Sequence, residues 1–158
     1  MPRRLVKSDD FLRPDPIYGS KQLSKFINCL MHGGRKATAQ RLVYDALKLI
    51  EERTKGTPPA IEVFEKAIEN VKPRVEVRSK RVGGANYQVP MQVNRRRQMS
   101  LAFRWIITAA RGEKGKPMSQ RLARELFDAF NGEGKAMNTR DQTHRMADAN
   151  KAFAHFAW

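Results

Sequence analysis

The sequence contains very little cysteine. Cys29 is the only cysteine among 158 residues, so no intramolecular disulfide can form. Disulfide-framed domains carry several cysteines, whereas proteins of a reducing compartment keep isolated thiols. We therefore expect a protein of a reducing compartment that is stabilised by a packed core.

Long apolar runs and leader segments are also absent. No stretch approaches the roughly 18 consecutive apolar residues that indicate a transmembrane helix. The first residues are basic but have no apolar centre, and Asp9, Asp10 and Asp15 argue against an organellar transit peptide. We expect a cytoplasmic protein at its mature length, with no membrane partner.

Residues that catalyse reactions or bind metals form no recognisable pattern. His32, His144 and His155 give neither HxxxH nor HExxH spacing, and there is no CxxC pair. Gly83-Gly84 fits a tight turn, because its surroundings match neither GxGxxG nor a P-loop. We predict no enzyme, no metal site and no cofactor.

Acidic residues are scarce beside basic ones. There are 16 Asp and Glu against 31 Lys and Arg, which gives a net charge of +15. Such an excess destabilises a compact fold by self-repulsion unless a polyanion neutralises it. A membrane-binding protein would gather its charge on an amphipathic helix with Trp anchors. Here the charge is spread over arms, loops and several helices, which favours nucleic acid.

Only residues 74–97 show the period of a β-strand. Apolar and polar residues alternate over 75–78 and again over 87–93, on either side of Gly83-Gly84. A period of two on both sides of a glycine turn is typical of a β-hairpin. Seven of the charged residues in this stretch are basic and one is acidic, so we predict a basic hairpin that contacts phosphates.

The hairpin can have two registers. A two-residue loop would place Val77 opposite Pro90, whereas an odd-length loop or a bulge would place Val77 opposite Val89 and Val75 opposite Met91. We predict the second register, because it gathers the apolar side chains on one face. The other face and the tip would then carry three basic residues: Arg78, Lys80 and Arg81.

Five segments repeat apolar residues with the period of a helix, and the tail is helical by propensity. We predict a mainly α fold, a six-helix bundle with a protruding two-stranded β-hairpin between the third and fourth helices. The whole chain, 1–158, would be a single RNA-binding domain. It would comprise a flexible basic N-terminal arm (1–18), three helices (19–73), the hairpin (74–93) and three further helices (94–158).

Aromatic residues near the hairpin and in the tail admit two interpretations. Tyr87 and Trp105 could stack on bases, or Tyr87 could pack across the hairpin and Trp105 against a neighbouring helix. The tail over 136–158 is helical by propensity but thinly apolar, and we expect a surface helix whose aromatic end docks.

The alternative to an RNA-binding structural protein is an architectural DNA-binding protein that uses the hairpin as a basic arm. Arms that enter the minor groove insert an apolar wedge at their tip. The tip here is Gly83-Gly84. Dispersed arginines without a reading helix suit folded RNA, which is recognised by shape and by its phosphates.

Several long motifs resemble the S7 family of small-subunit ribosomal proteins. They are RVGGANYQVPMQV followed by RRR, LAFRWIITAAR, FINCLMHGGRKATAQRLVYDAL and THRMADANKAFAHFAW, at residues 81–97, 101–111, 26–47 and 143–158. The match is collinear over essentially the whole chain. The resemblance implies a six-helix body with a hairpin and a place in the ribosome, cytoplasmic or organelle-encoded.

The resemblance also implies partners. Such a protein binds the 3′ major domain of small-subunit rRNA, nucleates assembly of the head, and lies at the subunit interface near the exit-site tRNA and nearby mRNA. It contacts ribosomal proteins S9 and S11. Carried onto this chain, the rRNA-binding residues would be Arg3, Arg4, Lys7, Lys21, Lys25, Arg35, Lys36, Arg74, Arg78, Arg95, Arg96, Arg97 and Arg111. The tRNA-facing tip would be Lys80, Arg81, Val82, Gly83, Gly84 and Ala85.

Overall fold

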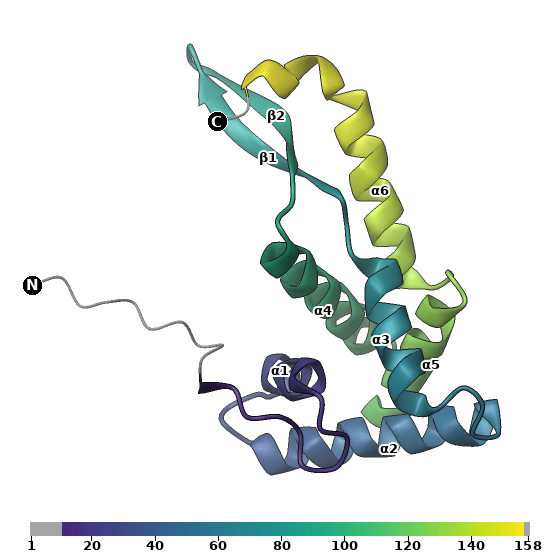
Figure 1. Cartoon of the computed structure of the whole chain (residues 1–158). Coiled ribbons are helices and arrows are strands. Elements are labelled where there is room, and N and C mark those ends of the chain that lie inside the picture. Colours follow the sequence, from purple (N-terminus) through teal and green to yellow (C-terminus); the bar gives the residue numbers. More distant parts are fainter. Residues whose placement is uncertain (1–10, 157–158) are drawn as a thin grey trace, which may run out of the picture.

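The apolar stripes of the helices meet in one core in the computed structural model, which describes residues 11–156 (Figure 1). Within these residues the chain forms six α-helices, one antiparallel hairpin and a final 3-10 helix. The elements are α1 Lys21–Leu30, α2 Lys36–Thr54, α3 Ala60–Val71, β1 Val75–Val82, β2 Ala85–Gln92, α4 Arg95–Gly112, α5 Met118–Phe130, α6 Lys135–Ala149 and η2 Lys151–Phe156. The predicted fold class is confirmed, with the hairpin between α3 and α4.

Aromatic side chains from three helices form the centre of the body. Phe26 of α1 lies edge-to-face against Phe64 of α3 and against Phe103 of α4, with ring centroids 5.3 Å apart in both pairs. All three side chains are fully buried, and α5 packs against α2, α3 and α4. α1 and α4 also contact each other directly. None of the described helices is long and apolar enough to cross a bilayer.

The segment before α1 is anchored by a buried carboxylate. Asp15 accepts hydrogen bonds from the backbone N–H groups of Ile17 and Tyr18, each at 3.1 Å, and from the hydroxyl of Tyr44 at 2.7 Å. Burial and the bond to Asp15 raise the pKa of Tyr44 to about 12, so this phenol stays protonated as a donor. The predicted N-terminal arm is therefore attached to α2 at Asp15.

The register of the hairpin differs from the predicted one. Val77 lies opposite Pro90 and not opposite Val89, and the strands are joined by a two-residue loop. The φ angles of Gly83 and Gly84 in this loop are +57° and +89°. Two successive positive φ angles are typical of type I′ turns, whose twist matches that of the strands they join. The predicted odd-length loop is therefore wrong.

The observed register mixes apolar and charged side chains on one face. This face carries Glu76, Arg78 and Lys80 from β1 and Tyr87, Val89 and Met91 from β2. The prediction of an apolar face opposite a basic one is therefore also wrong. Arg81 lies on the other face.

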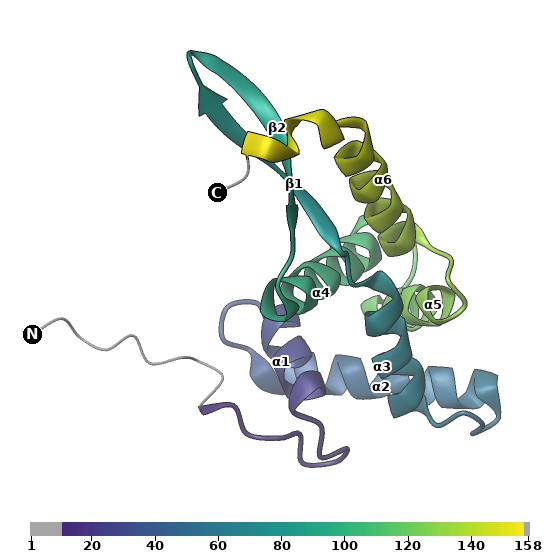
Figure 2. The same ribbon diagram turned by 45° about the horizontal axis from the view of Figure 1, so that its top comes forward.

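The C-terminal tail covers the mixed face of the hairpin (Figure 2). The ring of Tyr87 lies 5.3 Å from that of Phe153 and 5.2 Å from that of Phe156, measured between centroids. The ammonium group of Lys80 donates a hydrogen bond to the carbonyl of Phe156 at 2.8 Å. Docking of the aromatic tail is confirmed, and Tyr87 packs on η2.

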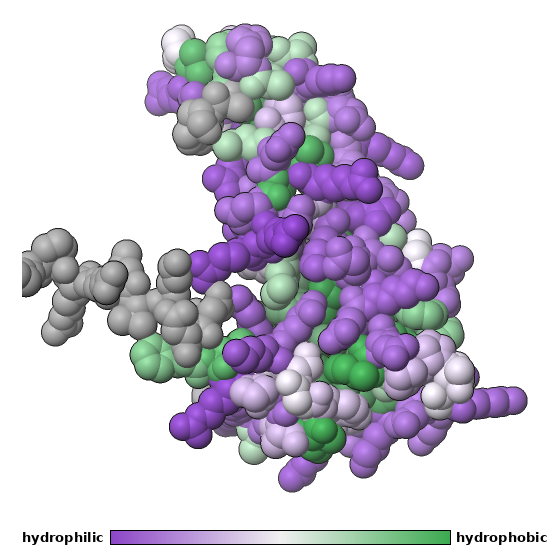
Figure 3. Space-filling view, in the orientation of Figure 1, coloured by the Kyte–Doolittle hydropathy of each residue, from purple (hydrophilic) through white to green (hydrophobic). Residues whose placement is uncertain are grey.

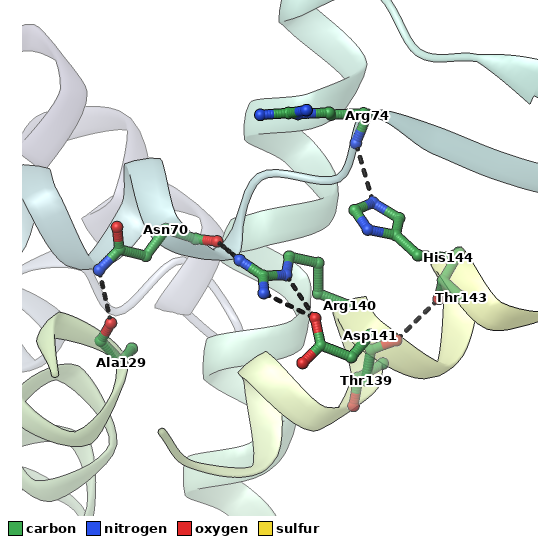
Figure 4. Close-up of polar contacts among 8 residues, drawn as sticks. All are labelled: Asn70, Arg74, Ala129, Thr139, Arg140, Asp141, Thr143 and His144. Carbon is green, nitrogen blue, oxygen red and sulfur yellow. Dashed lines mark hydrogen bonds and ion pairs between the residues drawn. The ribbon is translucent and has the colours of Figure 1, made fainter. Parts of the chain in front are cut away.

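A polar junction fixes α6 to the body below the hairpin (Figure 4). The guanidinium of Arg140 donates to the carbonyl of Asn70 at the end of α3, and the Asn70 amide donates to the carbonyl of Ala129 in α5 at 3.0 Å. The backbone N–H of Arg74 donates to Nε2 of His144 at 3.1 Å. These bonds join α3, α5, α6 and the chain entering β1.

The first turn of α6 is capped from another helix. The carboxylate of Glu125 in α5, which is 3 % exposed, accepts a hydrogen bond from the N–H of Ala136 at 2.7 Å. The chain reaches this position through Gly134, whose φ is +99°, and a Cβ there would lie 3.1 Å from the Glu125 carboxylate. Burial raises the pKa of Glu125, and the bond from Ala136 opposes this shift.

The hairpin should loosen when its aromatic contact with the tail is removed. We expect Tyr87→Ala to accelerate amide hydrogen exchange throughout β1 and β2, by lowering the free energy of local opening by roughly 1 kcal/mol. The matched control is Gln88→Ala, an exposed neighbour on the other face of β2. Equal exchange in both variants would show that the tail does not hold the hairpin.

The buried carboxylate should give a pH-dependent stability. The folded state holds the Glu125 proton more tightly than the unfolded state, so its contribution to stability falls as pH rises from the usual carboxyl pKa, about 4, to the raised value. Denaturant unfolding should show wild type gaining most over Glu125→Gln at the acidic end of this window and losing that advantage as pH rises. A difference independent of pH would contradict the assignment, and Glu133→Gln, an exposed change, is the control.

Candidate nucleic-acid interface

Basic residues from α1 and from the start of α4 come together on one side of the body. Lys21 and Lys25 of α1 and Arg95 and Arg96 of α4 line a hollow of about 350 Å³. The first turn of α4 is fixed by Asn94, whose side-chain oxygen accepts a hydrogen bond from a backbone N–H of that turn. The four predicted rRNA contacts are thus adjacent, although they come from distant parts of the sequence.

The basic side of the body continues along α4 to the loop that follows α1. Arg104 and Arg111 line a second hollow, of about 270 Å³, beside Cys29. Arg111 and Arg35 line a third, of about 490 Å³. We call these seven cations the α1/α4 surface: Lys21, Lys25, Arg35, Arg95, Arg96, Arg104 and Arg111.

Arg104 is the member of this surface that the sequence interpretation missed. It is exposed and lies about two helical turns from both Arg96 and Arg111, so all three share one face of α4. This spacing was readable in the sequence. Arg111 has a second role, because its guanidinium also donates to the carbonyl of Leu30 at the end of α1, at 3.1 Å.

Two predicted rRNA contacts are instead paired within the protein. The buried carboxylate of Glu76 binds Arg78 at 2.6 Å and Arg97 at 3.2 Å, one guanidinium on each oxygen. The contacts of Arg97 therefore differ from those of its neighbours Arg95 and Arg96, which line the first hollow. Part of the charge at the base of the hairpin is neutralised before any ligand binds.

The remaining predicted contacts are scattered. Arg74 lines a polar cleft with Arg140 and His144 at the junction, away from the three hollows of the α1/α4 surface. Lys36 is exposed at the first position of α2. Three further predicted contacts lie outside the described residues: Arg3, Arg4 and Lys7. Figure 3 shows that hydrophilic side chains cover the region between the body and the hairpin.

The tip of the hairpin has one exposed cation. Arg81 is exposed, as are Gly83, Gly84 and Ala85, while Val82 is half-buried. Lys80 is bound to the tail carbonyl and lies on the covered face. Arg81 is thus the tip residue best placed for a ligand beyond the body.

The described residues show no group of metal ligands, and their cysteine is not activated. Within 11–156, no three His, Cys, Asp or Glu side chains are grouped to hold a metal ion. Partial burial raises the pKa of the Cys29 thiol, opposed by Lys25 and Arg104, so the thiolate nucleophile is disfavoured. Trp105 is partly buried and packs against the core, as the packing interpretation expects.

Comparison with known proteins identifies the family. Residues 2–151 match the family described as ribosomal protein S7p/S5e. The chain belongs to this family. Proteins named small ribosomal subunit protein uS7 are similar over nearly the full length of both chains. The one from Rhodopirellula baltica is 61% identical over 155 residues, which cover 98% of this chain and 99% of that protein. The one from Nitratiruptor is 57% identical over 145 residues, covering 92% of each chain, and the one from Petrotoga mobilis is 53% identical over 158 residues, covering 100% of each.

Membership of the S7p/S5e family is consistent with the strongly basic composition of the chain. The chain is a structural ribosomal protein and not an enzyme. Its functional residues are accordingly those that bind a partner, and the basic surface is the leading candidate.

Proposed function

We propose that this protein binds the 3′ major domain of small-subunit rRNA through the α1/α4 surface and nucleates assembly of the subunit head. The observation that carries the proposal is the grouping of seven cations from α1, α4 and the chain between α1 and α2. Among the described residues, none of those lining the three hollows is acidic. Phosphates would neutralise this surface and relieve its self-repulsion.

RNA suits this surface better than duplex DNA. The cations come from two helices and a loop, so the contacts spread over a wider surface than the one face of α4 that carries Arg96, Arg104 and Arg111. Folded RNA is bound mainly through shape, phosphates and 2′-hydroxyl groups, which such a surface can contact at many points. The tip of the hairpin, Gly83-Gly84, has no bulky wedge of the kind that bends DNA.

We propose that the hairpin contacts a second ligand, separate from the rRNA bound by the α1/α4 surface. We infer that its tip faces the exit-site tRNA and nearby mRNA at the subunit interface, with Arg81 as the principal cation. The tail supports this role because it holds the hairpin away from the body (Figure 1). We also propose contacts with ribosomal proteins S9 and S11, as the family resemblance implies.

The test of rRNA binding is a comparison of ligands of equal charge. Affinity should be measured for a fragment of the 3′ major domain and for duplex DNA of the same charge, at several salt concentrations. We expect tighter binding of the fragment at every salt concentration, since shape contributes in addition to phosphate contacts. Equal affinities throughout would refute the proposal.

The arginines at the start of α4 should contribute unequally to binding of the rRNA fragment. Arg95→Gln should reduce the slope of log affinity against log salt by about one, as expected for one lost phosphate contact. Arg97→Gln should leave the slope nearly unchanged, because Glu76 already binds its guanidinium. The measurement is binding to the rRNA fragment over a salt series. Equal reductions in the two variants would place both guanidinium groups on phosphates.

The tip should be separable from rRNA binding. A shortened hairpin would lack four residues: Arg81, Val82, Ala85 and Asn86. Lys80 and Tyr87, which are Cα partners, would then flank the same Gly83-Gly84 turn, so the register and the tail contacts are kept.

We expect this variant to keep its helical circular-dichroism signal and its affinity for the rRNA fragment. Small subunits that contain it should retain exit-site tRNA less well than wild-type subunits. Arg81→Gln, which removes only the charge, tests whether electrostatics account for the effect. Loss of the rRNA affinity on shortening would show that the tip belongs to the rRNA surface.

A further inference from the structure

The junction between α6 and the body contains a polar cleft of about 560 Å³. Its lining comes from four parts of the chain: the end of α3, the residue before β1, the first turn of α4, and α6. The lining residues include Glu69, Lys72, Arg74, Gln98, Arg140 and His144. Three of them are cations and one is acidic, so the lining carries a net positive charge.

The guanidinium of Arg74 is the part of this cleft that is open to a ligand. Within residues 11–156 the polar contacts of Arg74 are made by its backbone, whose N–H donates to Nε2 of His144 and whose carbonyl accepts from a backbone N–H after β2, both at 3.1 Å. Figure 4 shows its side chain extending clear of the other residues drawn. Lys72 and Arg140, in contrast, each already bind a carboxylate. Arg74 can therefore bind an anion without breaking an ion pair of the described chain.

The ring of His144 supplies a second donor to the cleft. Its Nε2 accepts the hydrogen bond from the N–H of Arg74, so in the neutral ring the proton lies on Nδ1. In the part of the chain that the structure describes, Nδ1 has no hydrogen-bond partner. The backbone contact thus fixes the tautomer that presents an N–H donor to a ligand.

We propose that this cleft binds one phosphate of the RNA backbone, between the guanidinium of Arg74 and the Nδ1–H of His144. The inference rests on the proposed rRNA binding and adds a contact outside the α1/α4 surface. Guanidinium groups bind phosphate oxygens through paired N–H donors. The amide of Gln98, on a third side of the cleft, can donate to the same phosphate.

The first turn of α4 connects the cleft with the α1/α4 surface. Gln98 lines the cleft and Arg95 lines the first hollow, three residues apart in the same turn. Residues at this spacing are neighbours on a helix surface, with Cβ atoms roughly 5–6 Å apart. One RNA segment can therefore contact both sites. This continuity favours an RNA phosphate over the carboxylate of a partner protein as the anion in the cleft.

The first test removes the charge of the cleft's open cation. Arg74→Gln keeps the backbone N–H that His144 binds, so the fold should be unchanged. We expect roughly tenfold weaker binding to the rRNA fragment at low salt, and a salt slope reduced by about one, as for one lost phosphate contact. The matched control is Arg145→Gln, an exposed cation of α6 that does not line the cleft, and it should keep the wild-type slope. An unchanged slope in Arg74→Gln, or equal reductions in both variants, would overturn the inference.

The second test separates the donor of His144 from its contact with the backbone. In His144→Gln the side-chain amide can still accept from the N–H of Arg74, but the Nδ1–H donor is lost. We expect roughly fivefold weaker binding with an unchanged salt slope, because a neutral donor is removed, and wild-type amide exchange in β1. Wild-type affinity would overturn the role of His144. Weaker binding together with faster exchange in β1 would show that His144 only positions the hairpin, which also overturns it.

The RNA-side test locates the phosphate. Linkages of the fragment are replaced one at a time by uncharged methylphosphonates, and each fragment is measured with wild type, with Arg74→Gln and with Arg95→Gln. At one linkage the replacement should weaken wild-type binding by roughly tenfold and leave Arg74→Gln unaffected, because both changes remove the same contact. The same linkage should give additive losses with Arg95→Gln. Additive losses with Arg74→Gln at every linkage would overturn the inference.

Failure of this inference can be told apart from failure of rRNA binding. If Arg95→Gln lowers the salt slope while Arg74→Gln has no effect, the α1/α4 surface binds rRNA but the cleft takes no phosphate. If the wild-type protein shows no preference for the rRNA fragment over duplex DNA, the proposed function itself fails and the phosphate site with it.

Discussion

A two-stranded hairpin has no second layer of its own to cover its apolar side chains, and such hairpins are marginally stable alone in water. In this structure the C-terminal helices cover the hairpin and stabilise it. α6 runs from the body to the hairpin, and η2 places Phe153 and Phe156 against Tyr87. The junction at Asn70 and Arg140 fixes the other end of α6 to α3 and α5. The direction of the hairpin therefore depends on helix packing far from its tip.

The contacts that hold the hairpin also bind some of its positively charged side chains. The face of the hairpin that meets the tail carries Arg78 and Lys80, which must be satisfied where they are partly covered. Glu76 binds Arg78 together with Arg97, and the tail carbonyl of Phe156 binds Lys80. The ion pairs of Glu76 neutralise part of the charge at the base of the hairpin. The cations of the α1/α4 surface line three hollows of the body.

The helices were predicted correctly from the sequence where the pattern of apolar residues is compatible with only one secondary structure. The stripe of α4, for example Phe103 and Ile106, fits only a buried helix face, and both residues are fully buried. The aromatic residues at the end of the tail were expected to pack against another apolar surface, because their exposure to water is unfavourable. Six of the seven cations that lie together on the α1/α4 surface are among the residues predicted from the sequence to bind rRNA, and Arg104 is not. Asp15 was passed over too, because an aspartate among prolines gives no sign that it will be buried under Tyr44.

The sequence by itself determined the mainly helical class, the place of the hairpin and the excess of positive charge, because these follow from periodicity, glycine turns and composition. The register of the hairpin became known only from the folded structure, because alternation allowed both registers. In the observed one, both glycines of the two-residue turn have positive φ, and α6 and η2 cover the face on which Glu76 binds the arginines. Whether a cation forms an ion pair within the protein likewise depends on which carboxylates lie near it in the folded chain. Arg95 and Arg97 are nearly adjacent in sequence, yet one lines an open hollow and the other binds a buried carboxylate.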